Sequence, residues 1–191
     1  STFITFSLIH TKMLARSLTA GLRSGVPSIG SATLKQSSFR TFATSRSVLA
    51  QTLLLLEHKK GSIAAGSLVA ATAASKIGGD VDALIVGNSD LDGAVEAATK
   101  ISGLKKVHVA KDAKYEHLFA EPLAPLIKSV VEKGNYTHVF AGHSAIGRDV
   151  MARASALLDV SQISDIIAVE SEDTFQRPIY AGNALLTVKS N

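Results

Sequence analysis

The stretch from residue 136 to 170 constrains the fold of this chain more than any other part. Residues 136–141 form a short apolar run with β-branched and aromatic side chains, which is typical of a strand. Residues 142–147 carry two glycines, and apolar side chains then recur at helical spacing at Ile146, Val150, Ala154 and Leu157. Residues 164–170 return to a strand pattern. Parallel α/β sheets bind ligands where a strand turns into a helix in this way, so this loop is the first candidate for a functional site.

The same alternation of strand and helix patterns precedes this stretch. The unbroken apolar run at 51–56 predicts a strand buried on both faces, 81–87 predicts a second strand, and the alternation at 105–110 predicts a strand nearer an edge. Helical patterns occupy 63–77, 93–101 and a segment that ends near residue 133. We expect Ser62 to cap the first helix, the small polar residues at 88–92 to cap the second, and Pro122 and Pro125 to open the third in its N-terminal turn.

Strands that alternate with helices are joined by right-handed crossovers, which place the strands parallel and the helices on both faces of the sheet. The pattern changes after residue 171, where 174–180 and 184–189 are two strand-like runs joined by a short turn. The sequence therefore predicts an α/β fold with a mostly parallel sheet, helices on both faces and a terminal antiparallel strand pair. The last run reaches the final residue without a cap, and we expect more protein to follow it.

The charge of the chain is divided unevenly. Residues 1–50 carry six of the 20 basic residues and none of the 16 acidic ones, so the remainder is slightly acidic. The basic isoelectric point thus belongs to the N-terminal segment. A folded domain without a basic excess is not typical of nucleic-acid binding.

Residues 1–50 are rich in Ser and Thr, contain Arg and lack acidic residues, a composition typical of a mitochondrial transit peptide. We expect a disordered transit peptide and extension over 1–50 and a folded domain over 51–191. Met13 is a plausible start because the residues after it form a basic amphipathic helix pattern, and processing is expected near Arg40 or Arg46. Residues 1–12 are compatible with an over-extended gene model, and the alternative for the whole segment is a disordered tail without a targeting role.

Cysteine is absent, which excludes disulfides, thiolate metal sites and a Cys nucleophile. His138 and His143 could be imagined as a metal pair, but no acidic residue stands at ligand spacing beside them. We therefore predict no metal site.

Gly142-His143-Ser144 with Gly147 resembles the nucleophile elbow of α/β hydrolases. The second glycine comes one residue late, and the residue where the elbow needs a small side chain is Ile146. That fold also places its histidine after the serine, whereas all six histidines here precede Ser144. We predict that Ser144 caps a helix and that the chain has no catalytic constellation.

The same loop also resembles the phosphate-binding loop of nucleoside triphosphatases, with Gly142, Gly147 and Arg148 in place of the two glycines and the lysine. Asp149 stands where that loop has a hydroxyl for Mg²⁺, and a carboxylate there would repel phosphates. Gly61 and Gly66 have similar spacing but no lysine follows. Arg148 and Arg153 are interpreted as a solvated face or as contacts with another domain, and Asp165 as a turn former or an interface residue. The residues alone leave an α/β domain that could bind an adenine nucleotide at its strand ends.

Five motifs run in order over about residues 51–191, and the last two are specific in combination: TLLLLEH at 52–58, NYTHV at 135–139, AGHSA at 141–145, ISDII at 163–167 and RPIYAGNA at 177–184. Together they resemble the N-terminal domain of the electron transfer flavoprotein alpha subunit. The resemblance implies an adenine-nucleotide alpha-hydrolase-like fold. The mitochondrial-type N-terminal segment agrees with it independently.

The resemblance further implies a heterodimer of alpha and beta subunits in the mitochondrial matrix. Such a heterodimer carries electrons from acyl-CoA dehydrogenases to a membrane quinone oxidoreductase, in fatty-acid and amino-acid catabolism. Its carrier is one FAD, held mainly by the C-terminal domain of the alpha subunit, and the beta subunit holds a structural AMP. The chain is expected to be an electron-carrier subunit and not itself an enzyme.

The sequence departs from this family because the C-terminal FAD domain is absent from residues 1–191. No FAD ligand can therefore be assigned, and the loop at Gly142, His143 and Ser144 is interpreted as a vestigial nucleotide site. We expect a scaffold with exposed apolar surface near the terminal strands, which docks a beta subunit and binds no FAD alone. The alternative is a free-standing adenine-nucleotide-binding module of universal-stress-protein type.

Overall fold

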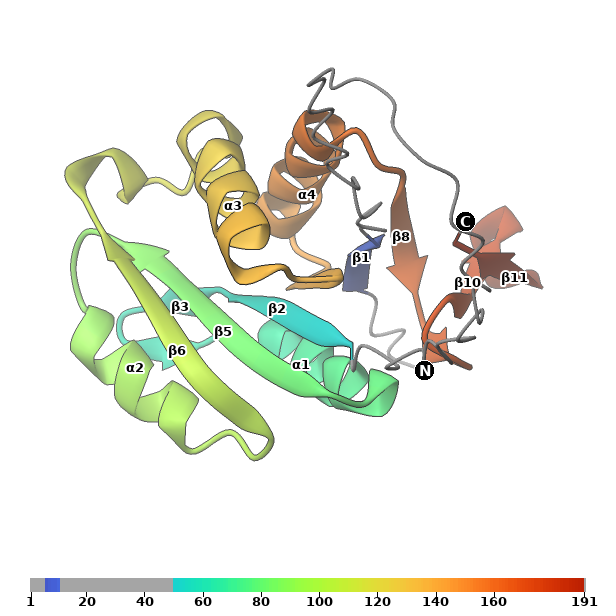
Figure 1. Cartoon of the computed structure of the whole chain (residues 1–191), viewed down its shortest axis with the longest axis horizontal. Coiled ribbons are helices and arrows are strands. Elements are labelled where there is room, and N and C mark those ends of the chain that lie inside the picture. The colour runs from blue at the N-terminus through green and yellow to red at the C-terminus, as the bar shows by residue number, and fades with distance from the viewer. Residues whose placement is uncertain (1–5, 11–49, 191) are drawn as a thin grey trace, which may run out of the picture. The chain divides into compact units, whose positions relative to one another are not determined.

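The computed structural model describes residues 6–10, as backbone only, and residues 50–190. A sheet of six strands forms the centre of the domain, in the order β6-β5-β2-β7-β1-β8 (Figure 1). The four strands β6, β5, β2 and β7 are mutually parallel, which confirms the predicted mostly parallel sheet. Their bounds are β1 Phe6–His10, β2 Gln51–Leu56, β5 Asp80–Gly87, β6 Leu104–Lys111, β7 His138–Gly142 and β8 Gln162–Ile166. As the alternating pattern predicted, β6 is an edge strand.

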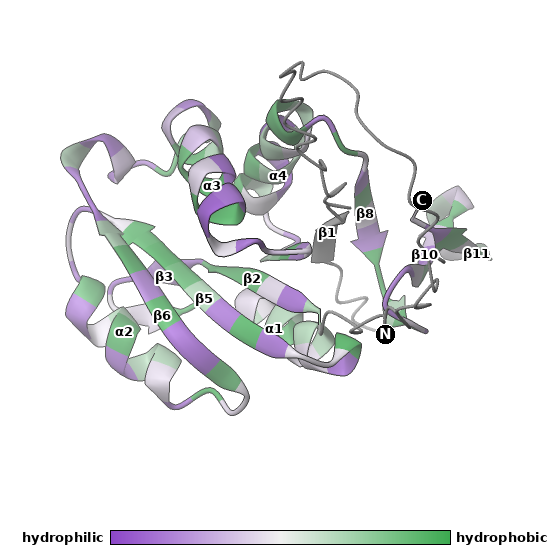
Figure 2. Cartoon of the chain, in the orientation of Figure 1, coloured by the Kyte–Doolittle hydropathy of each residue, from purple (hydrophilic) through white to green (hydrophobic). Residues whose placement is uncertain are grey.

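Helices cover both faces of this sheet, as the alternation of patterns predicted. They are α1 Ala65–Ile77, α2 Leu91–Thr99, α3 Ala120–Gly134 and α4 Ala145–Leu158. One apolar cluster joins α1 and α2 to Leu54 and Leu56 of β2, and a second joins α3 and α4 to Leu53 and Leu55. Because alternate side chains of a strand point to opposite faces, the unbroken leucine run fills both clusters. Each of these leucines stabilises the fold by roughly 1.5–3 kcal/mol, and Figure 2 shows the apolar colour along much of the neighbouring β5.

Three helix starts differ from the sequence predictions. Ser62 does not cap α1, because it lies in a small hairpin formed by β3 His58–Lys59 and β4 Ser62–Ile63. Lys60 and Gly61 both have positive φ, 51° and 74°, which is the geometry of a two-residue hairpin turn. Helix α2 starts at Leu91, and its N-cap residue Asp90 makes no side-chain capping bond. Helix α3 starts before both prolines, so Pro125 lies inside it and beyond its first turn.

The predicted strand at 164–170 is divided between two sheets. Residues up to Ile166 form β8 in the central sheet, whereas β9 Ala168–Val169 pairs with β10 Thr174–Ile179. Asp165 adopts a left-handed backbone conformation with φ 59°, which no regular strand tolerates and which redirects the chain. Strands β10 and β11 Ala184–Lys189 form the predicted antiparallel pair, and the second sheet has the order β11-β10-β9.

Strand β1 lies between β7 and β8 and is antiparallel to both. The sequence analysis placed its residues, Phe6–His10, in a disordered extension, and the structure differs from that expectation for these five residues. The neighbouring edges of β7 and β8 offer unpaired backbone N–H and C=O groups, which the inserted strand satisfies. The remainder of the expected transit peptide, 1–5 and 11–49, lies outside the described residues. Among the helices that are described, none is long and apolar enough to cross a membrane.

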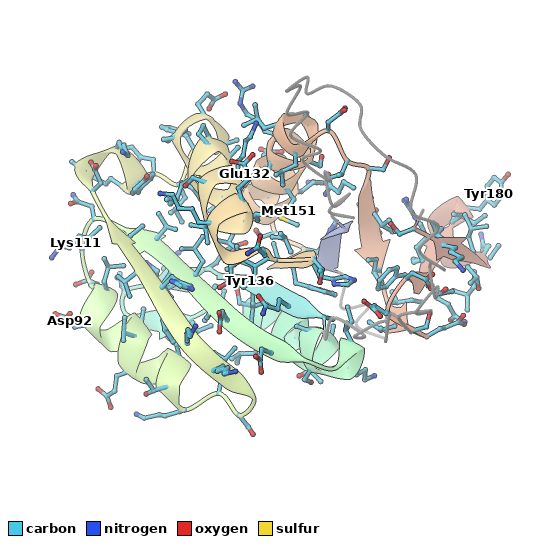
Figure 3. All side chains as sticks on the ribbon, viewed as in Figure 1. Asp92, Lys111, Glu132, Tyr136, Met151 and Tyr180 are labelled. Atoms are coloured by element: carbon cyan, nitrogen blue, oxygen red, sulfur yellow. The ribbon has the colours of Figure 1, made fainter. Side chains whose placement is uncertain are left out.

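A buried polar network crosses the strands beneath α3. Tyr136 lies at its centre (labelled in Figure 3). The Tyr136 hydroxyl donates a hydrogen bond to the Asp82 carboxylate at 2.6 Å, and the His108 ring nitrogen lies 2.9 Å from the same hydroxyl. Tyr136 and Asp82 are 4% and 7% exposed. Burial, with the added hydrogen bond to Asp82, raises the pKa of Tyr136 well above its ordinary value. The tyrosine therefore stays neutral and donates to Oδ2 of a buried carboxylate, whose other oxygen, Oδ1, has no hydrogen-bond partner among the described residues.

Replacing Tyr136 with phenylalanine is expected to lower the free energy of unfolding by about 1–3 kcal/mol, because Asp82 then loses a hydrogen-bond donor in a site that water does not reach. Urea unfolding measures the change. Tyr180→Phe is the matched control, since that side chain is 77% exposed and its loss of a hydroxyl should change stability by less than about 0.5 kcal/mol. Equal effects of the two substitutions would contradict the buried network.

Candidate functional site

The loop that the sequence singled out lies at the carboxyl end of β7, next to the end of β2. The chain leaves β2 on one side towards β5 and returns on the other side at β7, so these two strands flank the position where strand order reverses. Open α/β sheets bind ligands at this position. Gly142 ends β7, and Ser144 is the N-cap residue of α4.

Ser144 caps α4, as predicted. Its hydroxyl oxygen accepts a hydrogen bond from the Gly147 amide at 2.8 Å and donates to the Glu57 carboxylate at 2.6 Å. The acceptor of the Ser144 proton is thus a carboxylate and not a histidine, which differs from a hydrolase elbow. The sequence analysis missed Glu57, although it follows β2 directly and therefore had to lie at this edge of the sheet.

The glycines of the loop permit close backbone packing. A Cβ atom at Gly142 would lie 2.9 Å from the carbonyl carbon of Gly66, at the start of α1. A Cβ atom at Gly147 would lie 2.2 Å from the Gly142 carbonyl oxygen and 3.0 Å from a Glu57 carboxylate oxygen. The spacing that resembled a phosphate-binding loop thus serves contacts between α1, β7 and α4.

Glu57 is held by its backbone as well as by its side chain. The Glu57 amide donates to the Ser67 hydroxyl oxygen at 2.9 Å, and its carbonyl accepts from the Ala64 amide at 2.8 Å. Burial raises the pKa of the Glu57 carboxyl, against the opposing effect of hydrogen bonds from Ser144 and from the Gly147 amide. The carboxylate is therefore half-buried and held by Ser144 at the N-terminus of α4.

His143 takes part in a second cluster, which the sequence analysis did not foresee. Its Nε2 atom lies 3.0 Å from Asp165, and Arg177 of β10 lies 3.6 Å from the other oxygen of the same carboxylate. Asp165 was predicted to be a turn former or an interface residue, and the structure places it within β8, at a left-handed position beside a register shift, where its carboxylate bridges the loop to the second sheet. The signal that could have found it is its place in the fourth of the five motifs.

The two histidines imagined as a metal pair have separate partners. His138 is fully buried, with Nδ1 2.8 Å from the Thr137 hydroxyl and Nε2 3.0 Å from the Glu172 carbonyl oxygen, whereas His143 contacts Asp165. Within residues 50–190, no group of three or more His, Asp or Glu side chains is arranged to hold a metal ion.

Two hollows lie near the loop. One of about 210 Å³ lies beyond the ends of β2 and β5 and is lined by His58, Lys59, Lys60 and residues 86–90, among others. The other, of about 590 Å³, separates the start of α3 from α4 and includes Phe119, Asp149 and Arg153. Arg148 and Arg153 are both exposed, in agreement with a solvated face. Acidic side chains line both hollows, including Asp90 in the first and Glu121 in the second.

Apolar side chains are exposed on the terminal strands, as expected. Tyr180, Leu185 and Leu186 are 77%, 60% and 44% exposed, and we call these residues the terminal apolar surface. Leu185 and Leu186 follow one another in β11, so their side chains lie on opposite faces of the second sheet. Tyr180 projects from the edge of the molecule in Figure 3. The turn at Tyr180 and Ala181 has positive φ at two non-glycine residues, 50° and 55°. Such conformations are strained and cluster at functional sites.

Comparison with known proteins adds an independent finding. Residues 52–191 match the family model described as "Electron transfer flavoprotein domain". The chain is 47% identical over 151 residues to the probable electron transfer flavoprotein subunit alpha, mitochondrial, of Cryptococcus neoformans var. grubii. The aligned region covers 78% of this chain and 44% of that protein. The chain is 45% identical over 139 residues to the electron transfer flavoprotein subunit alpha of Pseudomonas aeruginosa, covering 73% and 44%.

A third relative gives the same result. The probable electron transfer flavoprotein subunit alpha, mitochondrial, of Schizosaccharomyces pombe is 42% identical over 138 residues, which covers 72% of this chain and 40% of that protein. The chain thus spans less than half the length of these curated relatives. The family match over most of the folded part, together with the α/β architecture, shows that this chain belongs to the electron transfer flavoprotein family.

Proposed function

We propose that the chain is the N-terminal scaffold domain of the alpha subunit of an electron transfer flavoprotein. The complete heterodimer carries electrons from acyl-CoA dehydrogenases to a membrane quinone oxidoreductase, in fatty-acid β-oxidation and amino-acid catabolism. The family match over residues 52–191 carries this proposal, and the printed names of the relatives, which are alpha subunits, support it. Two of those names include the word mitochondrial, which, with the composition of residues 1–50, supports the mitochondrial matrix as the location.

The chain acts as a carrier subunit without catalysis of its own. The polar groups of the loop support this view because they bind one another: Ser144 bonds Glu57, and His143 bonds Asp165. A nucleophile needs a base that can take its proton at neutral pH. Among the described residues, the Ser144 hydroxyl donates to a carboxylate and not to a histidine, which differs from the serine–histidine pair of hydrolases.

FAD is held by the C-terminal domain of the longer family proteins, and the AMP by the beta subunit. The described residues fit an FAD poorly. The amides at the start of α4, which could bind a pyrophosphate, face the Glu57 carboxylate, and Asp149 is exposed on the same helix. Negative groups repel a phosphate at such a position.

The terminal apolar surface docks the beta subunit. Tyrosine and arginine are enriched at the centres of protein interfaces, and the exposed Leu186 lies beside Arg177 across the β10–β11 pair. Arg177 is fixed by Asp165, so it is already ordered before a partner binds. Ordering in advance lowers the entropy cost of association.

Exchange of Leu185 for aspartate is expected to weaken binding to the beta subunit at least about tenfold, because a charge would be buried in the interface. Binding is measured by calorimetry or surface plasmon resonance with the beta subunit of the same organism. Phe119→Asp is the matched control, since Phe119 is also 60% exposed but lies at the groove between α3 and α4. A loss with Phe119→Asp and none with Leu185→Asp would place the interface elsewhere.

The purified chain is expected to contain no flavin, so its absorbance near 450 nm should be at background. Stoichiometric flavin would contradict the assignment of FAD to another domain. The adenine-nucleotide module of universal-stress-protein type is not favoured, because the chain matches alpha-subunit relatives over its folded part. Calorimetry with AMP and ATP tests that alternative directly, and heat at millimolar nucleotide would revive it.

A further inference from the structure

The N-terminus of α4 is the natural anion position of this fold. Helix α4 has 14 residues, and its first amides point towards the ends of β2 and β7. Backbone N–H groups and the helix dipole together favour a negative charge there, and α/β proteins commonly use such a position for a phosphate. In the described part of this chain, a side-chain carboxylate lies at the N-terminus of α4.

Three observations single out Glu57 as that charge. Its carboxylate accepts a hydrogen bond from the capping hydroxyl of Ser144, at 2.6 Å, and this hydroxyl in turn accepts from the Gly147 amide at 2.8 Å. Residue 147 is a glycine whose added Cβ would lie 3.0 Å from a carboxylate oxygen of Glu57, so the helix start closes around it. Glu57 is half-buried, and this burial raises the pKa of its carboxyl.

No counter-cation balances this carboxylate within residues 50–190. The ion pairs of that part of the chain involve other acidic residues, and the basic residues next in sequence, Lys59 and Lys60, are exposed in the β3–β4 hairpin. A carboxylate withdrawn from water needs compensation from hydrogen bonds or from a positive potential. Here the amide and hydroxyl donors at the start of α4 provide it.

We propose that Glu57 is a resident anion, a carboxylate that occupies the phosphate position at the start of α4 and closes it to nucleotides and other anions. Glu57 also joins the end of β2 to the start of α1, because its backbone amide bonds Ser67 and its backbone carbonyl bonds the Ala64 amide. A carboxylate in this position explains why the loop from Gly142 to Gly147 has the glycine spacing of a phosphate-binding loop but no lysine after it. It goes beyond the scaffold role, and it stands even if the partner of this chain is not the one proposed above.

The test is a phosphate titration of the full chain in which Glu57→Ala, Glu57→Gln and the wild type are compared. Thermal unfolding is followed while inorganic phosphate rises to about 50 mM at constant ionic strength, adjusted with sodium chloride. In Glu57→Ala the vacated position should accept phosphate, and a millimolar Kd would raise Tm saturably by about 5 °C. The wild type and Glu57→Gln, whose side chain still fills the position, should each shift by less than about 1 °C.

Each outcome decides the question. An equal, saturable response of the wild type would show that the position is already open, and it would overturn the proposal. Lack of a specific response in Glu57→Ala would show that the carboxylate is only a structural cap, and it would overturn the proposal as well. If Glu57→Ala does not fold, Glu57→Ser is refolded with and without phosphate. Failure of both variants in the presence of phosphate would likewise overturn it, because an external anion then cannot replace the carboxylate.

Discussion

Alanine at position 147 is expected to destabilise the domain by about 3 kcal/mol, although alanine is the better helix former. Gly147 lies in the first turn of α4, where exchange of glycine for alanine would ordinarily add about 1 kcal/mol of stability. The new Cβ atom would lie 2.2 Å from the Gly142 carbonyl oxygen. Because the obstacle is backbone, relief requires that α4 move away from β7, which also breaks the bonds of Ser144.

Gly66→Ala is the matched control for this substitution. Gly66 is also in the first turn of a helix, α1, but its added Cβ would only meet the Gly142 Cα atom at 3.8 Å, an ordinary contact. Its stability should stay unchanged or rise by up to about 1 kcal/mol. Urea unfolding of both variants measures the difference. A stabilising Gly147→Ala would mean that the loop is not packed as closely as the structure shows.

Truncation of Phe175 to alanine is expected to cost about 3–5 kcal/mol, the second large effect. Phe175 belongs to β10 of the second sheet, yet its side chain is fully buried in the apolar cluster under α1 and α2. It therefore fastens the second sheet to the central one. The loss should appear in the free energy of unfolding and as faster hydrogen exchange of the amides of β10.

The neighbouring strand supplies the control. Leu185 of β11 is 60% exposed, so Leu185→Ala should change stability by less than about 0.5 kcal/mol. Similar losses for the two variants would mean that Phe175 is not anchored in the core. Faster hydrogen exchange of the β10 and β11 amides in Phe175→Ala, with unchanged exchange in the central sheet, would in contrast agree with the anchoring role.

Much of the architecture could be predicted from local patterns. The leucine run of β2, the alternation of β6 and the helical spacing of α4 each placed an element correctly, because side-chain period reflects which faces are buried. The capping role of Ser144 was also predictable, since a serine before an apolar helical pattern is a strong start signal. Ser62 had the same signal, but the prediction that it caps α1 was wrong, because the hairpin turn at Lys60 and Gly61 places Ser62 in β4.

The contacts of the loop could not be predicted in the same way. Glu57 and Ser144 are 87 positions apart and meet only because β2 and β7 are adjacent in the sheet. Asp165 brings His143 and Arg177 together through a left-handed backbone conformation that no local pattern announced. The insertion of β1 between β7 and β8 was likewise not visible in the sequence.

The sequence by itself determined the order of strands and helices, the two-sided burial of the central strands and the family to which the chain belongs, since these depend on residue types and their periods. The tertiary structure decided what fills the start of α4 and which face of the second sheet is anchored and which is exposed. The reason is physical. Periodicity records whether a side chain meets water, whereas hydrogen bonds and close packing depend on which distant segments the folded sheet places side by side.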